Sequence, residues 1–184
     1  MPIRNTTVRW GALSQLFHWV IVALIITQFV LISIEQDLPL GLHKLVVLAR
    51  HKSVGITILG LALLRVVWRF MNPTPGLPNT LKPYERVLAK VTHVGLYVLL
   101  FVMPLTGWMM SSARNFPVSW FNLVQLPDLV GANRSLYEAL HTTHAILAWL
   151  LVAVATLHVL AALKHHFVLK DDTLRRMLPF TRTR

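Results

Sequence analysis

Four long apolar stretches separated by polar segments dominate the pattern along the chain. They cover residues 16–34, 54–70, 94–110 and 145–163. The first and last contain no charged residue over 19 positions, which is close to the length that a helix needs to cross a bilayer core. The second contains Arg65, and the third contains Pro104, which we expect to kink it, as helices packed in lipid tolerate. The pattern therefore predicts an all-α integral membrane protein.

The polar segments set the expected helix boundaries. Three prolines within residues 72–78 end the second helix, because proline cannot continue one. Ser135 and Glu138 match a capping box and predict the start of the fourth helix. The four spans are expected at about 13–34, 51–71, 91–111 and 139–164, in one transmembrane domain over 1–184.

Two connecting regions carry expectations of their own. The segment 111–134 is the longest connection, and its Trp120 and Phe121 are expected at the lipid surface. The basic tail after Phe167 predicts one or two amphipathic turns on the inner surface.

The charge distribution predicts an orientation. The net charge is +11, and with both termini inside, the basic residues divide as 13 inner against 5 outer. Such asymmetry follows the positive-inside rule and predicts cytoplasmic termini in a bacterial inner membrane. Nucleic acid is not an expected partner, because no soluble module presents the basic residues. The inner set is Arg4, Arg9, Arg65, Arg69, Lys82, Arg86, Lys90, Lys164, Lys170, Arg175, Arg176, Arg182 and Arg184, and the outer set is Lys44, Arg50, Lys52, Arg114 and Arg134.

The absence of cysteine limits the chemistry. It excludes disulfides, thiolate-bound zinc, iron–sulfur clusters and covalently attached c-type haem. A haem in this chain must be held by His or Met. The N-terminal apolar stretch is longer than a typical signal core and lacks an A-x-A-like site, so we do not expect a cleaved signal peptide.

Histidines are the candidate ligands. His144 and His158 lie fourteen residues apart on the fourth predicted helix. Helix geometry separates them by about 21 Å along the axis and only about 40° around it, so both face one side. Matching the depths of the other spans pairs His18 with His158 near the inner surface and His51 with His144 near the outer surface. Each pair is predicted to hold one planar macrocycle between two helices.

Other polar residues have alternative interpretations. Arg65 lies at the predicted depth of His158 and is expected to bind haem propionates, whereas Arg69 favours snorkelling to the surface. His165 shares the face of His158 but lies at the inner headgroup level, which favours contact with a quinone or a proton over haem ligation. His93 faces the same region, and a solvated interfacial role is equally compatible with the positions of His93 and His165. The remaining histidines are interpreted as interfacial, with His141 as a possible substitute for His144; they are His43, His141 and His166.

These residues resemble the bacterial cytochrome b561 family, which comprises four-helix, dihaem b-type cytochromes of the inner membrane. The resemblance rests on the order of the four histidines and covers nearly the whole chain. RVVWRFMNPTP at 65–75, PLTG at 104–107 and KDDTLRRMLP at 170–179 resemble its single-subunit members of Escherichia type.

The resemblance implies two haem b groups with two axial histidines each, and electron exchange with ubiquinone. For the single-subunit type it implies a superoxide:quinone oxidoreductase that oxidises periplasmic superoxide to dioxygen, with no obligatory protein partner. His165 matches a family position near the quinone. Bis-histidine ligation also favours outer-sphere electron transfer, and Lys44, Arg50 and Lys52 form a hypothetical patch for attracting the anion.

Two alternatives to a superoxide oxidase stay open. The chain is also compatible with a cytochrome b subunit that relays electrons between a dehydrogenase or hydrogenase and quinone. A histidine-based metal or proton transporter is a third class, which the absence of acidic residues from the first and fourth spans disfavours.

Overall fold

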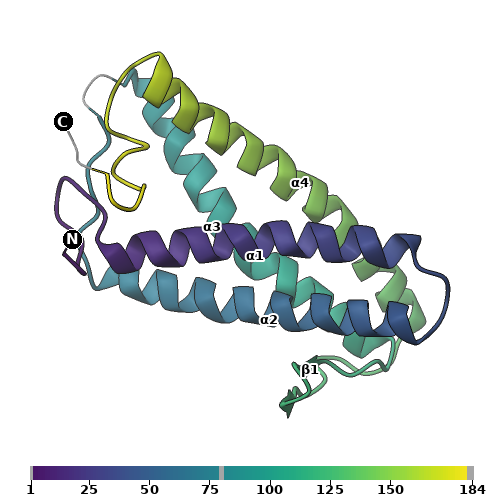
Figure 1. Ribbon diagram of the computed structural model, residues 1–184. Coiled ribbons are helices and arrows are strands. Elements are labelled where there is room, and N and C mark those ends of the chain that lie inside the picture. The colour runs from purple at the N-terminus through teal and green to yellow at the C-terminus, as the bar shows by residue number, and fades with distance from the viewer. Residues whose placement is uncertain (1, 79–80, 182–184) are drawn as a thin grey trace. The chain divides into compact units, whose positions relative to one another are not determined.

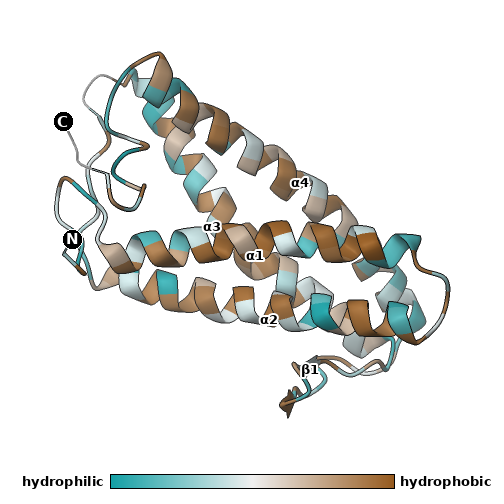
Figure 2. Ribbon diagram, in the orientation of Figure 1, coloured by the Kyte–Doolittle hydropathy of each residue, from teal (hydrophilic) through white to brown (hydrophobic). Residues whose placement is uncertain are grey.

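The computed structural model describes residues 2–78 and 81–181, and four long helices make up most of them (Figure 1). These are α1 (Ala12–Asp37), α2 (Leu42–Phe70), α3 (Pro83–Ala113) and α4 (Arg134–Phe167). All four are long and apolar enough to cross a membrane. Hydrophobic residues dominate their central turns, and hydrophilic residues concentrate toward their ends and in the connections (Figure 2). The predicted all-α membrane fold is confirmed. Arg182 and Arg184 of the predicted charge asymmetry lie outside the described residues.

The helices extend beyond the expected membrane spans, most of all at the start of α2. α2 begins at Leu42 rather than near residue 51, so His51 lies more than two turns inside the helix. No helix-breaking residue separates Leu42 from His51, and the charged positions simply belong to the polar end of a longer helix. α3 continues through Pro104.

The cap of α4 differs from the predicted capping box. The Leu136 backbone N–H donates to Asn133 Oδ1 at 2.9 Å, so Asn133 caps the helix. Ser135 lies within the first turn, and Glu138 forms an ion pair with Arg134 at 3.0 Å. The asparagine two residues earlier therefore takes the position that the sequence pattern assigned to serine.

The chain forms two compact units, each containing segments of all four helices. Unit 1 comprises residues 1–20, 63–98 and 150–184, and unit 2 comprises residues 21–62 and 99–149. The buried core of unit 2 joins residues from α1, α2 and α3. Its members are Ile21, Val54, Ile58, Ala62 and Leu100.

In unit 1, the C-terminal tail packs against the start of α1 (Figure 1). Gln15 Nε2 and Trp19 Nε1 donate to the backbone carbonyls of Arg176 and Met177, at 3.1 and 2.9 Å. The tail forms turns rather than a regular helix. Polar side chains of α1 thus donate hydrogen bonds to backbone carbonyls of the tail. In a regular helix, backbone N–H groups of the tail itself would have satisfied these carbonyls.

In unit 2, a short hairpin interrupts the connection before α4. Its strands are β1 (Ser119–Trp120) and β2 (Val124–Gln125), paired antiparallel. The Phe121 backbone N–H donates to Ser53 Oγ, and Trp120 Nε1 donates to Thr57 Oγ1, both at 3.0 Å. These bonds attach the hairpin to α2. Trp120 and Phe121 are 36% and 49% exposed, and their position at the lipid surface stays a prediction.

Candidate functional site

The inner pair, His18 on α1 and His158 on α4, lies entirely within unit 1. The two ring centres are 6.3 Å apart. His93 on α3 approaches the same imidazole of His158 more closely, with ring centres 5.4 Å apart. The structure therefore brings together three histidines from three helices at this level, of which the sequence analysis paired two.

The outer pair, His51 on α2 and His144 on α4, lies entirely within unit 2. Its ring centres are 6.5 Å apart. His141 contacts the Tyr137 ring instead, at 5.9 Å between centres. Both histidine pairs expected from matching depths are thus close in space.

The spacing of each pair fits a metal ion held between two imidazoles. A transition-metal–imidazole bond is about 2.0 Å and the bonded nitrogen lies about 1.2 Å from the ring centre, so two imidazoles on opposite sides of one ion have centres about 6.4 Å apart. The inner and outer pairs, at 6.3 and 6.5 Å, match this requirement. The spacing of His93 and His158 is about 1 Å too short. The four histidines therefore fit the axial ligands of two haem irons, and their ligation stays a prediction.

The second nitrogens of these histidines have different surroundings. His144 Nδ1 lies 3.0 Å from the Thr106 hydroxyl oxygen, and His18 Nδ1 lies 3.1 Å from Arg65 Nη2. His51 Nδ1 is buried and makes no hydrogen bond within the described residues. The Nδ1 atom thus faces a hydroxyl in His144 and a guanidinium in His18, and it has no hydrogen-bond partner among the described residues in His51.

Arg65 lies beside the inner pair rather than at the end of α2. Its guanidinium carbon is 5.5 Å from the centre of the Tyr97 ring, and that of Arg69 is 5.6 Å from the same ring. Arg69 also lies 5.7 Å from the Trp10 ring centre. Aromatic faces stabilise both cations, and no carboxylate of the described residues lies within ion-pair distance of either. Arg65 is therefore close enough to the inner pair to contact a cofactor held there.

His165 is held by residues of the C-terminal tail. Its Nδ1 lies 2.6 Å from Asp171 Oδ2 and 3.4 Å from the Thr173 hydroxyl. Burial acts to raise the pKa of Asp171, but hydrogen bonds from Thr173 and His165 outweigh burial, so this pKa lies below its ordinary value. The carboxylate therefore stays ionised and orients the imidazole.

A pocket of about 350 Å³ adjoins this contact between tail and helix. It is lined by His166, Phe167, Lys170, Asp171 and Arg175. Asp171 thus belongs both to the pocket wall and to the hydrogen-bonded pair with His165.

The predicted outer cation patch is partly neutralised. Lys44 Nζ lies 3.5 Å from a Glu35 carboxylate oxygen and donates to the Glu35 and Leu38 carbonyls. Lys52 Nζ lies 3.7 Å above the Phe116 ring and donates to the Phe116 carbonyl. Of these two lysines, only Lys52 has no carboxylate of the described residues within ion-pair distance of its ammonium group. Lys44 therefore contributes less to attracting anions than the sequence predicted.

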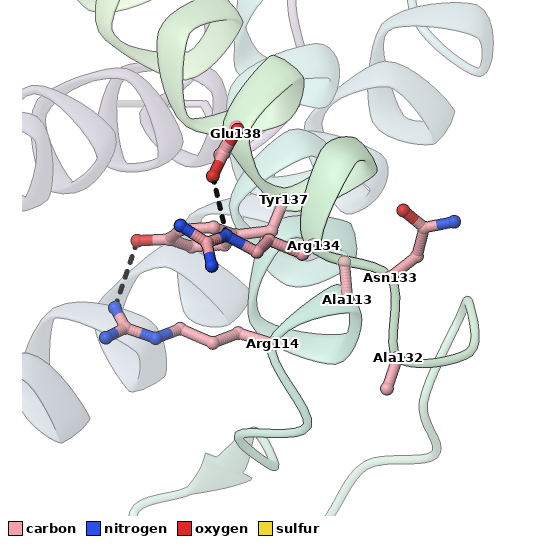
Figure 3. A pocket seen from close by; sticks show the side chains of 7 residues that line it. All are labelled: Ala113, Arg114, Ala132, Asn133, Arg134, Tyr137 and Glu138. Atoms are coloured by element: carbon pink, nitrogen blue, oxygen red, sulfur yellow. Dashed lines mark hydrogen bonds and ion pairs between the residues drawn. The ribbon is translucent and has the colours of Figure 1, made fainter.

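A second pair of outer cations lines a surface pocket of about 530 Å³ (Figure 3). Arg114 Nη1 donates to the Tyr137 hydroxyl at 3.0 Å, with its guanidinium 5.0 Å from the centre of that ring. Arg134 is paired with Glu138 in the same pocket. Arg114 thus keeps its positive charge unneutralised, whereas the charge of Arg134 is balanced.

Comparison with known proteins decides the family. Residues 9–180 match the family described as prokaryotic cytochrome b561. The chain belongs to this family. The expected family is therefore confirmed, and the chain is a multi-pass membrane protein of an electron-transfer family that implies b-type haem.

Curated members of the family resemble the chain over nearly its whole length. It is 35% identical to cytochrome b561 homolog 2 of Escherichia coli K12, over 97% of this chain and 95% of the relative. It is 33% identical to the probable superoxide oxidase CybB of Yersinia pestis, over 93% of this chain and 96% of the relative. Cytochrome b561 homolog 1 of Escherichia coli K12 is 24% identical, over 93% and 97% of the two chains.

Several residues that support the site were not singled out from the sequence. Thr106 had been noticed only as part of the PLTG phrase, and Asp171 only as part of the tail phrase. Tyr97 and Arg114 carried no local signal, because one aromatic ring and one loop arginine are common in any membrane protein. The side-chain partners of the histidines therefore required the structure.

Proposed function

We propose that this cytochrome is an inner-membrane superoxide:quinone oxidoreductase with two b haems and cytoplasmic termini. The observation that carries the proposal is the spacing of the two histidine pairs, each of which fits an iron between two imidazoles. Family membership supports b-type haem and electron transfer. The relative from Yersinia pestis is named a probable superoxide oxidase, which supports superoxide as the donor.

The inner pair would hold one haem and the outer pair the other, and Arg65 would bind propionates of the inner haem. Haem held by these histidine pairs would supply one-electron transfer. His18 has to present an iron-facing Nε2 lone pair, so its Nδ1 has to carry the proton. The Arg65 guanidinium can only donate hydrogen bonds, so it could no longer bond to a protonated His18 Nδ1. Propionate oxygens would then be its new acceptors.

Two unneutralised cations would attract the anionic donor to the outer side. Lys52 follows the outer-pair residue His51 directly and lies within electrostatic reach of Arg114. Neither makes an ion pair with a carboxylate among the described residues, and both belong to unit 2 with the outer pair. A positive field around the outer pair would raise the local concentration of superoxide.

His165 and Asp171 would bind and protonate ubiquinone on the inner side. Overall, two superoxide anions give two molecules of dioxygen and two electrons, and ubiquinone takes up these electrons with two protons to form ubiquinol. The His165 imidazole, oriented by the Asp171 carboxylate, would donate a hydrogen bond to a quinone oxygen and pass it a proton. The exposed His93 lies beside the inner pair and is the other candidate for a quinone contact.

Rapid mixing of the purified holoprotein with superoxide tests the activity. We expect superoxide to reduce the protein, and added ubiquinone to reoxidise it with one ubiquinol formed per two superoxide consumed. The proposal is supported if superoxide disappears faster than by spontaneous dismutation and if this faster loss requires quinone. A spectrum that superoxide leaves oxidised, in a protein that dithionite reduces, would contradict it and favour the relay subunit.

The relay alternative predicts a different donor. A cytochrome subunit of that kind would be reduced only by a dehydrogenase or hydrogenase bound to its surface. The metal-transporter alternative has less support, because the described residues contain no group of three or more His, Asp or Glu side chains arranged to hold a metal ion.

A further inference from the structure

We infer that Thr106 fixes the protonation state of the His144 ring and thereby tunes the outer haem; this rests on the proposed function. Thr106 lies on α3, one residue before Gly107, and is buried with 9% of its surface exposed. Its hydroxyl lies 3.0 Å from His144 Nδ1. The contact joins α3 to α4 within unit 2.

The hydrogen-bond pattern places a proton on His144 Nδ1. The Thr106 hydroxyl donates to the Met103 carbonyl at 2.8 Å. A hydroxyl has one hydrogen, so its oxygen faces His144 as an acceptor. An acceptor oxygen therefore lies 3.0 Å from His144 Nδ1, and only an Nδ1–H can donate to it.

This protonation state leaves the opposite nitrogen ready to bind iron. A neutral imidazole carries one hydrogen, so a proton on Nδ1 leaves the Nε2 lone pair free. Metal-bound histidines commonly donate their second N–H to an oxygen acceptor in this way, which fixes the ring and makes it a stronger electron donor. Thr106 on α3 supplies this acceptor to His144 on α4.

Gly107 keeps the ring in position beside this acceptor. A Cβ atom at Gly107 would lie 3.1 Å from His144 Cε1 and 3.6 Å from His144 Nδ1. The 3.1 Å distance is tighter than an ordinary van der Waals contact, so a side chain at position 107 would require the ring to shift by a few tenths of an ångström. The pair Thr106–Gly107 thus combines an acceptor with the space for the imidazole.

The other three predicted ligands lack such an acceptor from a threonine side chain. His18 Nδ1 faces the donor Arg65, and His51 Nδ1 makes no hydrogen bond among the described residues. Neither ring nitrogen of His158 makes a hydrogen bond within residues 2–78 and 81–181. The outer haem should therefore depend on Thr106 more strongly than the inner haem depends on any one hydroxyl.

Thr106→Val and Thr106→Ser in the purified holoprotein test the inference by spectroelectrochemical titration and haem content. Valine keeps the shape and removes the acceptor, whereas serine keeps the hydroxyl. Thr27→Val is the matched control, because among the described residues the Thr27 hydroxyl bonds to the Ala23 carbonyl and to no histidine. We expect Thr106→Val to favour the reduced outer haem about two- to tenfold, the size of one net hydrogen bond. This is an upward shift of about 20–60 mV in its one-electron potential.

The outcomes separate this inference from the proposed function. The inference predicts wild-type potentials for both haems in Thr106→Ser and in Thr27→Val. It also predicts a wild-type potential for the inner haem in Thr106→Val. Loss of one haem from Thr106→Val but not from Thr106→Ser also supports it. Unchanged potentials in a two-haem Thr106→Val protein overturn the inference alone, as does a serine variant that behaves like valine. A wild-type protein without two haems overturns the proposed function, and this inference with it.

Discussion

Replacing the three inner histidines one at a time tests which of them hold haem. His18 and His158 have ring centres 6.3 Å apart, close to the 6.4 Å or so that two axial imidazoles on one iron require. His93 and His158, at 5.4 Å, would have to separate by about 1 Å to admit an iron. Since protein interiors resist such displacements, we expect His18→Ala and His158→Ala to lower the haem content from two to one per chain. His93→Ala should retain both haems.

The assay is haem per polypeptide, measured as the pyridine haemochrome of detergent-purified protein. His43→Ala is the matched control, because His43 is an exposed histidine near the start of α2. Reduced-minus-oxidised spectra should lose one component in the His18 and His158 variants and none in the His93 variant. A His93→Ala protein with one haem, together with a His18→Ala protein with two, would show that the ring spacings had been misinterpreted.

Four further predictions concern the charged residues. Arg65→Gln should lower the inner haem potential by roughly 60 mV, tenfold in the redox equilibrium, because a cation stabilises the reduced state; an unchanged titration would exclude contact with that haem. Asp171→Asn should raise the ubiquinone KM roughly tenfold by removing a charge-assisted hydrogen bond to His165, and an unaltered KM would separate Asp171 from quinone binding. The lowered pKa of Asp171 means that its ionised form stabilises the tail above about pH 4, and this contribution is lost as pH falls through the folded pKa. Hydrogen-exchange protection factors over residues 168–181, corrected for the intrinsic exchange rate at each pH, should therefore fall in acid in wild type, and an equal fall in Asp171→Asn would contradict this. Lys52→Gln combined with Arg114→Gln should slow the reaction with superoxide roughly tenfold at low salt and flatten its salt dependence, whereas a wild-type rate at low salt would remove both residues from donor attraction.

The fold followed from the sequence because lipid imposes a strict requirement on it. Backbone polar groups in a bilayer have to be satisfied within the segment, so long apolar stretches become helices almost regardless of detail. Helix starts were less predictable. Charged residues such as Lys44 and Arg50 indicate where the apolar core ends, but they do not end a helix, so α2 begins before them.

The candidate site was predictable where it depended on helix geometry. Fourteen residues between His144 and His158 determine their separation and shared face on any α-helix, and this limits which residues of other spans can meet them. The partners of the rings depend instead on how neighbouring helices pack. Thr106 and Asp171 act through side chains of other segments, and no local sequence pattern marks a threonine in an apolar helix as a partner of histidine.

The most direct test of the central claim is the haem stoichiometry and spin state of the purified wild-type protein. Two histidine pairs with iron-spanning ring distances predict two b haems per chain. Electron paramagnetic resonance of the oxidised protein should then show only low-spin ferric signals, because imidazoles fill both axial positions of each iron. A colourless protein, a single haem per chain, or a dominant high-spin signal would contradict the account.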